Sequence, residues 1–396
     1  MNITRASLLP VPVTPPTARN DKALRTHQGI PGVAKLPSGR LLATWYTGGT
    51  TECRLNYVLL AYSDDDGLTW TEAGAVIDPP HPDVRAFDAT LWRTPDGRVL
   101  WFWAQGCGGP DGVSGYSDEV FDGLVGVWFV EVENPDAAAG HFRFSEPRRI
   151  SNGIMLNKPT VLSDGTWALP CSLWSVKSDH WDFQRDLNPT YGAMMVVSQD
   201  GGKTFHLRGT LDVNTLGEPP SFDEHMFLER RDGAIACYVR CNRGVGMSLS
   251  RDGGGTWSNL TLTSLPGKDC RFFIGRLASG RVLLVANDSF QCREKLTAFL
   301  SEDDGETWPH KLLLDERKGV SYPDASQDGD GHIYITYDYN RTQGGYLYMA
   351  RLDEADILAG RLSESSYLRR EIDHSHPVPP KDGAPAGCCK AASRRQ

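Results

Sequence analysis

Polar side chains gather just before six turns of the sequence Asp-Gly or Ser-Gly. Carboxylates and histidines can transfer protons near neutral pH, and arginines and lysines can bind an anion. Because charged residues are rarely buried without partners, these residues either form ion pairs between neighbouring elements or line a binding pocket. We leave both interpretations open and favour the pocket. The residues are His27, Gln28, Arg85, Asp88, Lys158, Asp223, Glu224, His225, Arg271, Tyr322 and Asp324.

The turns that follow these residues recur along the chain. Each joins two strands with alternating apolar side chains, as in "SGRLLATWY", "DGRVLWFWA" and "DGHIYITYD". The turn glycines are 47 to 68 residues apart, at Gly39, Gly97, Gly165, Gly233, Gly280 and Gly331. Six such units predict an all-β fold, a six-bladed β-propeller of four-stranded antiparallel blades whose inner strands carry the polar residues to a central channel. Only "DEADILAG" suggests a short helix.

A second motif, S-x-D-x-G-x-T-W, occurs four times and marks the turn after the third strand of a unit. The copies begin at Ser63, Ser198, Ser250 and Ser301, and the second has Phe205 in place of Trp. Ser and Asp side chains can close a tight turn on nearby backbone amides, Gly tolerates positive φ, and Trp packs beneath the hairpin. We therefore expect these boxes to stabilise the fold and to carry no chemistry.

Composition limits the domain organisation and the class of partner. The chain has 396 residues, 40% of them hydrophobic, and a net charge of −9, which argues against a nucleic-acid partner. We expect one propeller over residues 1–370, with "SLLPVPV" near the N-terminus supplying a strand to the last blade. Residues 371–396 are rich in Pro, Gly, Ala and Ser and are expected to be disordered.

Targeting signals and cofactor motifs are missing from the pattern. No apolar run is long enough for a membrane span, and prolines interrupt the apolar N-terminal stretch. We expect a cytoplasmic protein with no membrane partner, or a secreted or periplasmic one if a leader has been removed. The nine cysteines lack paired spacing and favour buried reduced thiols. We expect no metal site and no cofactor, because neither paired ligand spacing nor a phosphate-binding loop occurs.

The boxes and the polar strands together resemble the sialidases, also called neuraminidases, over about residues 25–350. "FDEHMFLERRDGAIACYVR" resembles a segment in which a Glu precedes a carboxylate-binding Arg by sixteen residues, which implies Glu224 and Arg240. "REKLTAFLSEDDGETW" resembles a segment with another such Arg ahead of a box, which implies Arg293. "GVSYPDAS" resembles the segment of the last blade that holds the nucleophile, which implies Tyr322.

This resemblance implies a coherent reaction. A phenol, with an ordinary pKa near 10, is a weak nucleophile until a neighbouring carboxylate takes its proton, so Glu224 would serve as the base for Tyr322. A neutral phenol also avoids the repulsion between a carboxylate nucleophile and an anionic sugar. Arg240 and Arg293 would bind the substrate carboxylate through forked donors.

The chain departs from the family pattern at two places. Sialidases have Arg-Ile-Pro in the first inner strand, whereas this chain has Gly29-Ile30-Pro31, so one arginine of a three-arginine clamp is absent. Arg85, Arg271 or Lys158 is a candidate replacement. Gln28, His225 and Asp324 are further candidates for substrate binding. The general acid is Glu52, in the loop where the family has its Asp, or Asp88, and His27 could also transfer a proton.

The sequence therefore supports three functions. The first is a sialidase-like exo-glycosidase that hydrolyses a terminal, acidic sugar of an oligosaccharide or glycoconjugate with retention, using Tyr322 as nucleophile. The second is a propeller-type rhamnosidase or rhamnose–glucuronate lyase that uses a channel histidine, for which His27 is the candidate. The third is a glycan-binding propeller without catalytic activity.

Overall fold

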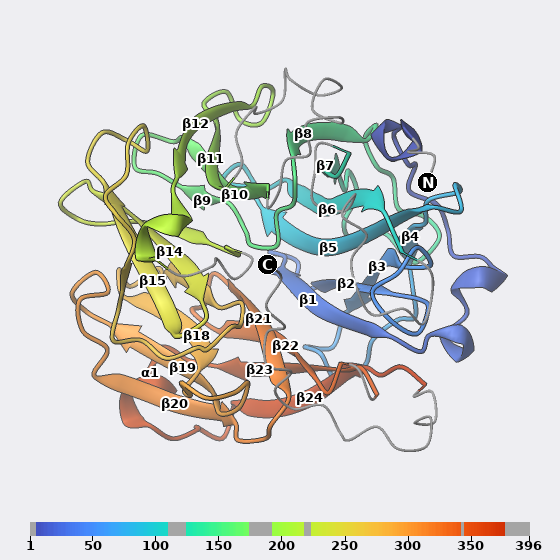
Figure 1. The fold of residues 1–396 in the computed structure, drawn as a ribbon. Helices are drawn as coiled ribbons and strands as arrows, with labels where there is room; N and C mark the ends of the chain where they lie inside the picture. Colours follow the sequence, from blue (N-terminus) through green and yellow to red (C-terminus); the bar gives the residue numbers. More distant parts are fainter. Residues whose placement is uncertain (1–4, 110–123, 174–191, 218–222, 342–343, 377–396) are drawn as a thin grey trace, which may run out of the picture.

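Tight glycine turns join the strands, as the sequence predicts. The computed structural model describes residues 5–109, 124–173, 192–217, 223–341 and 344–376. In these residues the six predicted turn glycines all have φ between 82° and 96°, a conformation that L side chains rarely adopt. The strands form six four-stranded antiparallel sheets around a common centre, which confirms the predicted six-bladed propeller (Figure 1).

Each of the first three blades is a meander. Blade 1 contains β1 (Gln28–Lys35), β2 (Leu41–Thr47), β3 (Tyr57–Ser63) and β4 (Ala75–Ile77). Blade 2 contains β5 (Val84–Arg93), β6 (Val99–Cys107), β7 (Gly126–Glu131) and β8 (Arg148–Asn152). Blade 3 contains β9 (Thr160–Val161), β10 (Trp167–Leu173), β11 (Gly192–Ser198) and β12 (His206–Leu211).

The last three blades repeat this order. Blade 4 contains β13 (Met226–Glu229), β14 (Ile235–Cys241), β15 (Gly244–Ser250) and β16 (Thr261–Leu262). Blade 5 contains β17 (Phe273–Arg276), β18 (Val282–Asn287), β19 (Leu296–Ser301) and β20 (His310–Asp315). Blade 6 contains β21 (Val320–Gln327), β22 (Ile333–Tyr339), β23 (Tyr346–Leu352) and β24 (Tyr367–Asp373).

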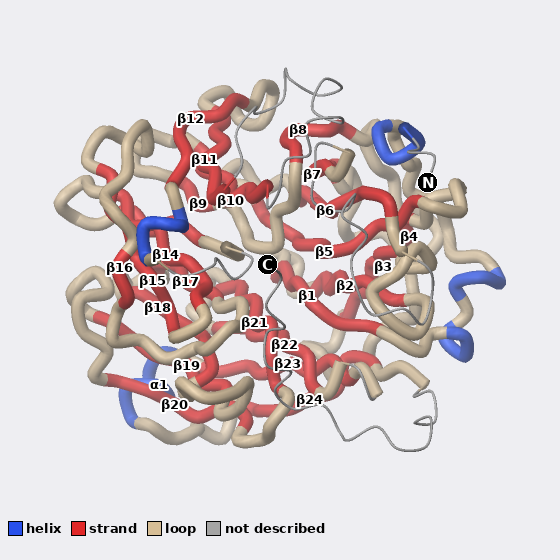
Figure 2. Tube along the Cα trace, viewed as in Figure 1, coloured by secondary structure: helices blue, strands red, loops and turns tan. Residues whose placement is uncertain are grey.

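In the part of the chain that the structure describes, helical structure is limited to short segments (Figure 2). The α-helix α1 (Glu354–Ala359) lies where "DEADILAG" suggested one. The 3-10 turns are η1 (Arg5–Leu8), η2 (Ala18–Asn20), η3 (Lys22–Leu24) and η6 (Val213–Leu216). No helix among the described residues is long and apolar enough to cross a membrane.

Blade 1 and blade 6 meet directly and close the ring. Strand β1 packs against β21 and β22. Two carboxylates of blade 6 accept hydrogen bonds from backbone amides of β1: Asp338 from Ile30 at 3.0 Å and Asp324 from Val33 at 2.8 Å. Because both carboxylates are buried, these bonds satisfy groups that would otherwise be costly to bury.

The predicted contribution of the N-terminal segment to the last blade is wrong. All four strands of blade 6 come from residues 320–373, and Thr14 instead forms an antiparallel bridge with Val76 in β4 of blade 1. The predicted end of the propeller at residue 370 also falls short, since β24 continues to Asp373. Most of the segment predicted to be disordered, residues 377–396, lies outside the described residues.

The four boxes have the predicted turn geometry. In the first, the Ser63 hydroxyl donates to Asp65 at 2.8 Å and accepts from the amide of Gly67 at 2.8 Å, while the amide of Thr69 donates to Asp65 at 2.8 Å. The copies that begin at Ser198, Ser250 and Ser301 repeat these three bonds. Each box therefore closes its own hairpin.

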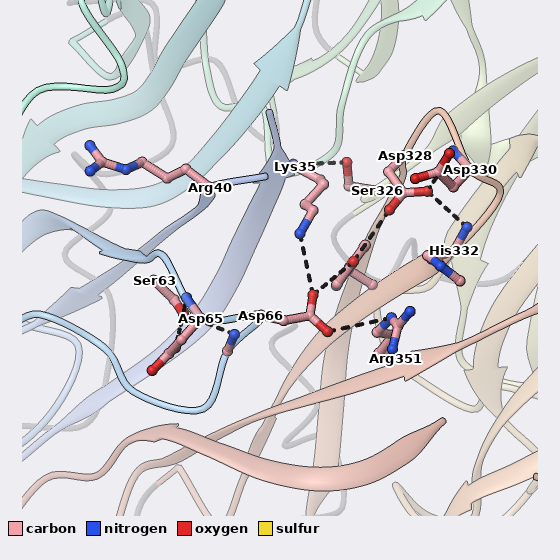
Figure 3. A network of polar contacts seen from close by, with 12 residues as sticks. Lys35, Arg40, Ser63, Asp65, Asp66, Ser326, Asp328, Asp330, His332 and Arg351 are labelled. Carbon is pink, nitrogen blue, oxygen red and sulfur yellow. Dashed lines mark hydrogen bonds and ion pairs between the residues drawn. The ribbon is translucent and has the colours of Figure 1, made fainter. Parts of the chain in front are cut away.

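The first box also joins blade 1 to blade 6. Figure 3 shows Asp66, the residue after the box aspartate, between Lys35 of β1 and Arg351 of β23, with ion-pair distances of 3.2 Å and 3.5 Å. The hydroxyl of Tyr334 in β22 donates to Asp66 at 2.8 Å. The contacts of Asp66 therefore join blades 1 and 6 in addition to the hydrogen bonds made by the backbone amides of β1.

Blade packing forms the core. The largest apolar cluster extends over blades 1, 2 and 3 and includes Tyr46, Trp101, Trp103 and Met194. Smaller clusters lie between the other neighbouring blades, for example Val285, Ala325 and Ile335 between blades 5 and 6. The seven cysteines among the described residues are all free, and all but Cys292 are buried, as the sequence predicts.

Candidate active site

Backbone bulges in three inner strands place the side chains of the site. The register of β1, β5 and β21 shifts at Ile30, Asp88 and Tyr322, which have φ of 56°, 49° and 53°. Positive φ is rare outside glycine and costs free energy, so it persists only where the surroundings impose it. At Ile30 the amide is held by Asp338. Asp88 and Tyr322 therefore occupy equivalent positions in blades 2 and 6.

Tyr322 and Glu224 contact each other at the centre of the candidate site. The Oη atom of Tyr322 donates to Oε1 of Glu224 at 3.1 Å. Nη1 of Arg240 donates to the same Oε1 at 2.7 Å and to Oη of Tyr322 at 3.2 Å. The three residues predicted from separate strands are therefore brought together in one buried hydrogen-bonded group.

Burial governs the ionisation of this tyrosine. Removal from water disfavours the phenolate and raises the pKa of Tyr322, the charge of Glu224 raises it further, and the nearby arginines oppose both effects. The phenol is thus neutral at neutral pH and needs a base to become a nucleophile. Oε2 of Glu224 has no hydrogen-bond partner among the described residues, so this carboxylate has capacity to accept a proton.

Asp269 accepts hydrogen bonds from Arg240 and Arg293, the two arginines that the resemblance to sialidases implies. Its carboxylate accepts from Nη2 and Nε of Arg240 at 2.6 Å and 3.1 Å. Its backbone oxygen accepts from Nη2 and Nε of Arg293 at 2.7 Å and 3.2 Å. The guanidinium carbon of Arg293 lies 5.1 Å from the centre of the Tyr322 ring. Sequence reasoning did not identify Asp269, although its position before Arg271 in the inner-strand segment was a usable signal.

A third arginine, Arg341, contacts the same tyrosine and was also missed. It follows β22 in blade 6, and its guanidinium carbon lies 4.7 Å from the centre of the Tyr322 ring. Its Nη2 is 3.5 Å from Oε1 of Glu52, and its Nη1 donates to Oη of Tyr46 at 3.5 Å. No sequence signal marks Arg341, because it lies far from the turns used to locate the inner strands.

The candidate proton donors lie beside this group. Glu52 accepts a hydrogen bond from Tyr46 at 2.9 Å, and Nε2 of His27 is 3.5 Å from the same tyrosine oxygen. Burial raises the pKa of Asp88 to about 7; Arg85 opposes this shift, while the charges of Glu52 and Glu224 add to it. All five predicted catalytic residues, Tyr322, Glu224, Glu52, Asp88 and His27, therefore belong to one neighbourhood.

Arg85 is buried at the blade 2 side of this neighbourhood. Its guanidinium lies 3.9 Å from the centre of the Phe87 ring. Its Nε atom has no hydrogen-bond partner among the described residues. Arg85 thus remains a candidate for an anion contact, as the sequence suggested.

Two other predicted residues tie the blades together along the centre. Lys158 donates to the backbone oxygens of Val33 and Ala325 at 2.5 Å and 2.6 Å and forms a 2.8 Å ion pair with Asp324. Arg271 donates to four backbone oxygens, those of Leu156, Pro31, Tyr322 and Pro323. These contacts match the alternative of ion pairs and hydrogen bonds between blades, and we do not extend substrate binding to Lys158, Arg271 or Asp324.

His225 and Gln28 are likewise engaged within the fold. Nε2 of His225 is 2.9 Å from the backbone oxygen of Met194 and its Nδ1 is 3.3 Å from the Ser172 hydroxyl. Burial lowers the pKa of His225 to about 4, so this imidazole is neutral at neutral pH. Gln28 donates to the backbone oxygen of Gly345 at 2.8 Å and accepts from Trp45 at 3.2 Å.

Known proteins resemble this chain in sequence pattern and in fold. A family model described as "BNR repeat-like domain" matches residues 39–335. No curated protein matches the chain. The solved structures that match include three of similar rank. The Hadza microbial sialidase Hz136 is 18% identical with a TM-score of 0.59, and the match covers 80% of this chain and 64% of that one.

The other two matches are of similar quality. The NanB sialidase of Streptococcus pneumoniae is 13% identical with a TM-score of 0.61, and the match covers 88% of this chain and 71% of that one. A protein of unknown function from Dyadobacter fermentans is 17% identical with a TM-score of 0.58, with 84% and 94% covered. The chain thus spans about two thirds of the length of the Hadza sialidase, and at these identities the likeness concerns the fold.

Proposed function

The chain belongs to the BNR repeat-like family, in the superfamily of sialidase-type propellers, and we propose that it is a glycosidase for a terminal acidic sugar. The observation that carries this proposal is the hydrogen bond of 3.1 Å between Oη of Tyr322 and Oε1 of Glu224. Arg240 and Arg293 add positive charge at the same point. A phenol beside cations suits an anionic sugar better than a carboxylate nucleophile would.

The reaction would proceed in two displacements. Glu224 takes the phenolic proton as Tyr322 attacks the anomeric carbon, and the bond to the leaving oxygen breaks as a general acid protonates that oxygen. In the second step a water attacks the anomeric carbon and loses a proton to the general acid, which is now a carboxylate, while the bond to Tyr322 breaks and Glu224 returns its proton to the departing phenolate. Two inversions give net retention, and the covalent intermediate is a glycosyl-tyrosine.

Asp88 is the better candidate for the general acid. Its pKa of about 7 keeps a substantial protonated fraction near neutral pH, which a proton donor needs. Glu52 instead accepts a hydrogen bond from Tyr46 and lies 3.5 Å from Arg341, the contacts of an ionised carboxylate. The bulge at Asp88, equivalent to the bulge at Tyr322, supports the same assignment, since backbone strain of this kind clusters at functional sites.

Arg240 and Arg293 would have different roles: Arg240 positions catalytic residues, and Arg293 binds the substrate. Arg240 contacts Glu224, Tyr322 and Asp269, so it keeps the base, the nucleophile and Arg293 in register. Arg293 donates through Nε and Nη2 to the backbone oxygen of Asp269 and not to its carboxylate. Its charge is therefore available to an anionic substrate.

The first test is turnover of a panel of 4-methylumbelliferyl glycosides, with a sialoside, a glucuronide and a rhamnoside included. We expect release from an acidic glycoside, and Tyr322→Phe should reduce it at least a thousandfold while the ligand still binds. Tyr62→Phe, which removes a β3 hydroxyl that accepts a hydrogen bond from the amide of Ala139, is the matched control. Equal rates in wild type and Tyr322→Phe would exclude the tyrosine mechanism.

A second candidate function rests on the contact of 3.5 Å between His27 and Tyr46. A histidine beside a phenol could remove the proton from C5 of a uronate and protonate the leaving oxygen, which would make the enzyme a rhamnose–glucuronate lyase. Elimination creates a conjugated double bond with ultraviolet absorption. Growth of that absorption, lost in His27→Ala and kept in Tyr322→Phe, would favour this function. Binding of sugars without turnover would favour a glycan-binding protein.

A further inference from the structure

Gly29 and Arg341 share one volume. A Cβ atom added to Gly29 would overlap Cδ of Arg341 and would lie 2.7 Å from its Cγ and 2.9 Å from Oδ2 of Asp338. Gly29 is not at a positive φ, so its backbone does not require glycine. The space that a side chain at position 29 would need is taken mainly by the Arg341 side chain, with Oδ2 of Asp338 beside it.

The guanidinium of Arg341 completes a ring of cations around Tyr322. Its carbon is 4.7 Å from the tyrosine ring centre, compared with 5.1 Å for Arg293, and Arg240 donates to the tyrosine hydroxyl at 3.2 Å. The three arginines come from blades 4, 5 and 6. Glu224 and Asp269 pair with Arg240, whereas the guanidinium groups of Arg293 and Arg341 both lie over the Tyr322 ring, an arrangement that suits an anion bound between them.

We propose that Arg341 is the third arginine of the substrate clamp and that Gly29 is small in order to admit it. The inference rests on the proposed function and adds a specificity-determining residue to it. A cation that strand β1 could supply at position 29 is supplied instead by the loop after β22, across the joint between blades 1 and 6. The missing arginine of the first strand is thus replaced from the neighbouring blade.

The other candidate replacements fit less well. Lys158 and Arg271 donate hydrogen bonds to backbone oxygens of neighbouring blades. Arg85 packs against Phe87 in blade 2. Arg341 alone combines a position over Tyr322 with occupation of the space beside Gly29.

Glu52 helps to orient the guanidinium of Arg341. It lies 3.5 Å from Nη2 of Arg341, and Tyr46 lies 3.5 Å from Nη1, so both ends of the guanidinium are oriented from β2 and its following loop. A partner at that distance leaves the guanidinium able to turn toward a substrate carboxylate. Such preorganised, charge-assisted bonds are among the stronger polar contacts in proteins.

The test compares ligands that differ only in charge. N-acetylneuraminic acid and its methyl ester form one pair, and glucuronic acid and glucose form another; binding is measured by calorimetry. In the pair that binds, Arg341→Gly should lower the affinity for the acid by about ten- to a hundredfold. The affinity for the neutral partner should stay within threefold of the wild-type value. Arg361→Gly, an exposed arginine of the same blade, is the control and should change neither.

The shared volume predicts a specific rescue. In the wild-type background, Gly29→Arg should lower the affinity for the acidic ligand, because the new side chain displaces Arg341. In the Arg341→Gly background the same substitution should recover at least tenfold of the lost affinity, since the guanidinium then approaches from β1. Loss without recovery would overturn the proposal.

Gly29→Ala is the milder variant if Gly29→Arg fails to fold. It should weaken acid binding in the wild type and have a clearly smaller effect in the Arg341→Gly background, where only Oδ2 of Asp338 still limits the added methyl group. Additive effects would show that the two residues do not share the space, and would overturn the inference.

The two ligand pairs distinguish a failure of this inference from a failure of the proposed function. Charge-dependent binding of glucuronic acid with the same variant pattern, without any sialoside turnover, would sustain Arg341 as an anion-binding residue and discard the sialidase assignment. Sialoside turnover unaffected by Arg341→Gly would do the reverse. If wild type binds neither acid more tightly than its neutral partner, the clamp itself is refuted.

Discussion

Tyr322 and Glu224 are 98 residues apart in the sequence, yet a hydrogen bond of 3.1 Å joins their side chains. They belong to blades 6 and 4, with blade 5 between them, so the bond can form only because the inner ends of the blades converge. Both residues have positive φ, 53° and 40°, which turns their side chains out of the regular alternation of a strand. The propeller thus stores backbone strain at the pair that we propose as nucleophile and base.

The base is tested by Glu224→Gln. The substitution keeps the shape and a hydrogen-bond acceptor but removes the charge that draws the phenolic proton. General-base catalysis contributes about 10²- to 10⁴-fold, so we expect kcat on the best acidic substrate to fall by that factor, measured at a temperature where the variant is fully folded. Glu371→Gln, at an exposed residue of β24, is the control. A kcat within twofold of wild type would exclude Glu224 as the base.

Much of the fold could be predicted because it follows from local patterns. The turn glycines occur once in each blade and have a conformation that only glycine adopts readily, so they identify the six blades one by one. Each box makes its hydrogen bonds within a few residues, as Ser301 does with Asp303 and Gly305. Such patterns need no knowledge of the rest of the molecule.

The site was harder to predict because it depends on contacts between blades. The sequence placed Tyr322 and Glu224 on inner strands, but nothing in it shows that Arg341 crosses Gly29 from another blade. It also gives no sign that the side chains of Arg271 and Lys158 turn to backbone oxygens at the centre. The direction of a side chain at a bulge depends on the register of the partner strand.

Arg271 provides a prediction about stability. Its guanidinium is buried and donates to the backbone oxygens of four residues in or beside three inner strands. Arg271→Met fills similar volume but leaves four buried acceptors unsatisfied, so we expect the free energy of unfolding to fall by about 3 kcal/mol or more. Urea unfolding monitored by tryptophan fluorescence measures it.

The control for this variant is Arg361→Met, at an exposed arginine of the same chain. It should change the free energy of unfolding by less than about 0.5 kcal/mol. If Arg271→Met also costs less than about 1 kcal/mol, the guanidinium does not act as a joint between blades, and its place as a substrate ligand would have to be reconsidered.

The boxes predict a smaller effect that involves no catalysis. Ser301 is fully buried; its hydroxyl donates to Asp303 at 2.7 Å and accepts from the amide of Gly305 at 2.8 Å. Ser301→Ala leaves that amide without its acceptor, which should lower the free energy of unfolding by about 1–3 kcal/mol. Turnover should stay unchanged at temperatures well below unfolding. Ser365→Ala, at an exposed serine, serves for comparison, and a loss of turnover in Ser301→Ala would contradict a purely structural box.

Asp88 predicts how activity depends on pH. Because its pKa is raised to about 7, the acid form needed for proton donation is present below pH 7 and is lost above it. We expect kcat/KM for a lactosyl glycoside of the substrate sugar to fall as the pH rises through 7. Asp88→Asn should lower the plateau by about 10²- to 10⁴-fold and remove this decline. An aryl glycoside, whose leaving group needs less protonation, should lose much less.

The same carboxyl group predicts how stability depends on pH. Its pKa is about 3.8 in the unfolded chain and about 7 in the folded one, so between these values the folded state binds the extra proton. The contribution of Asp88 to stability is therefore complete below about pH 4, declines as the pH rises to 7, and stays at its lowest above that. Asp88→Asn removes the decline, so its melting temperature should exceed that of wild type at pH 8 by more than at pH 5. Equal differences at the two pH values would show that Asp88 ionises normally in the folded protein, and the general acid would then have to be Glu52.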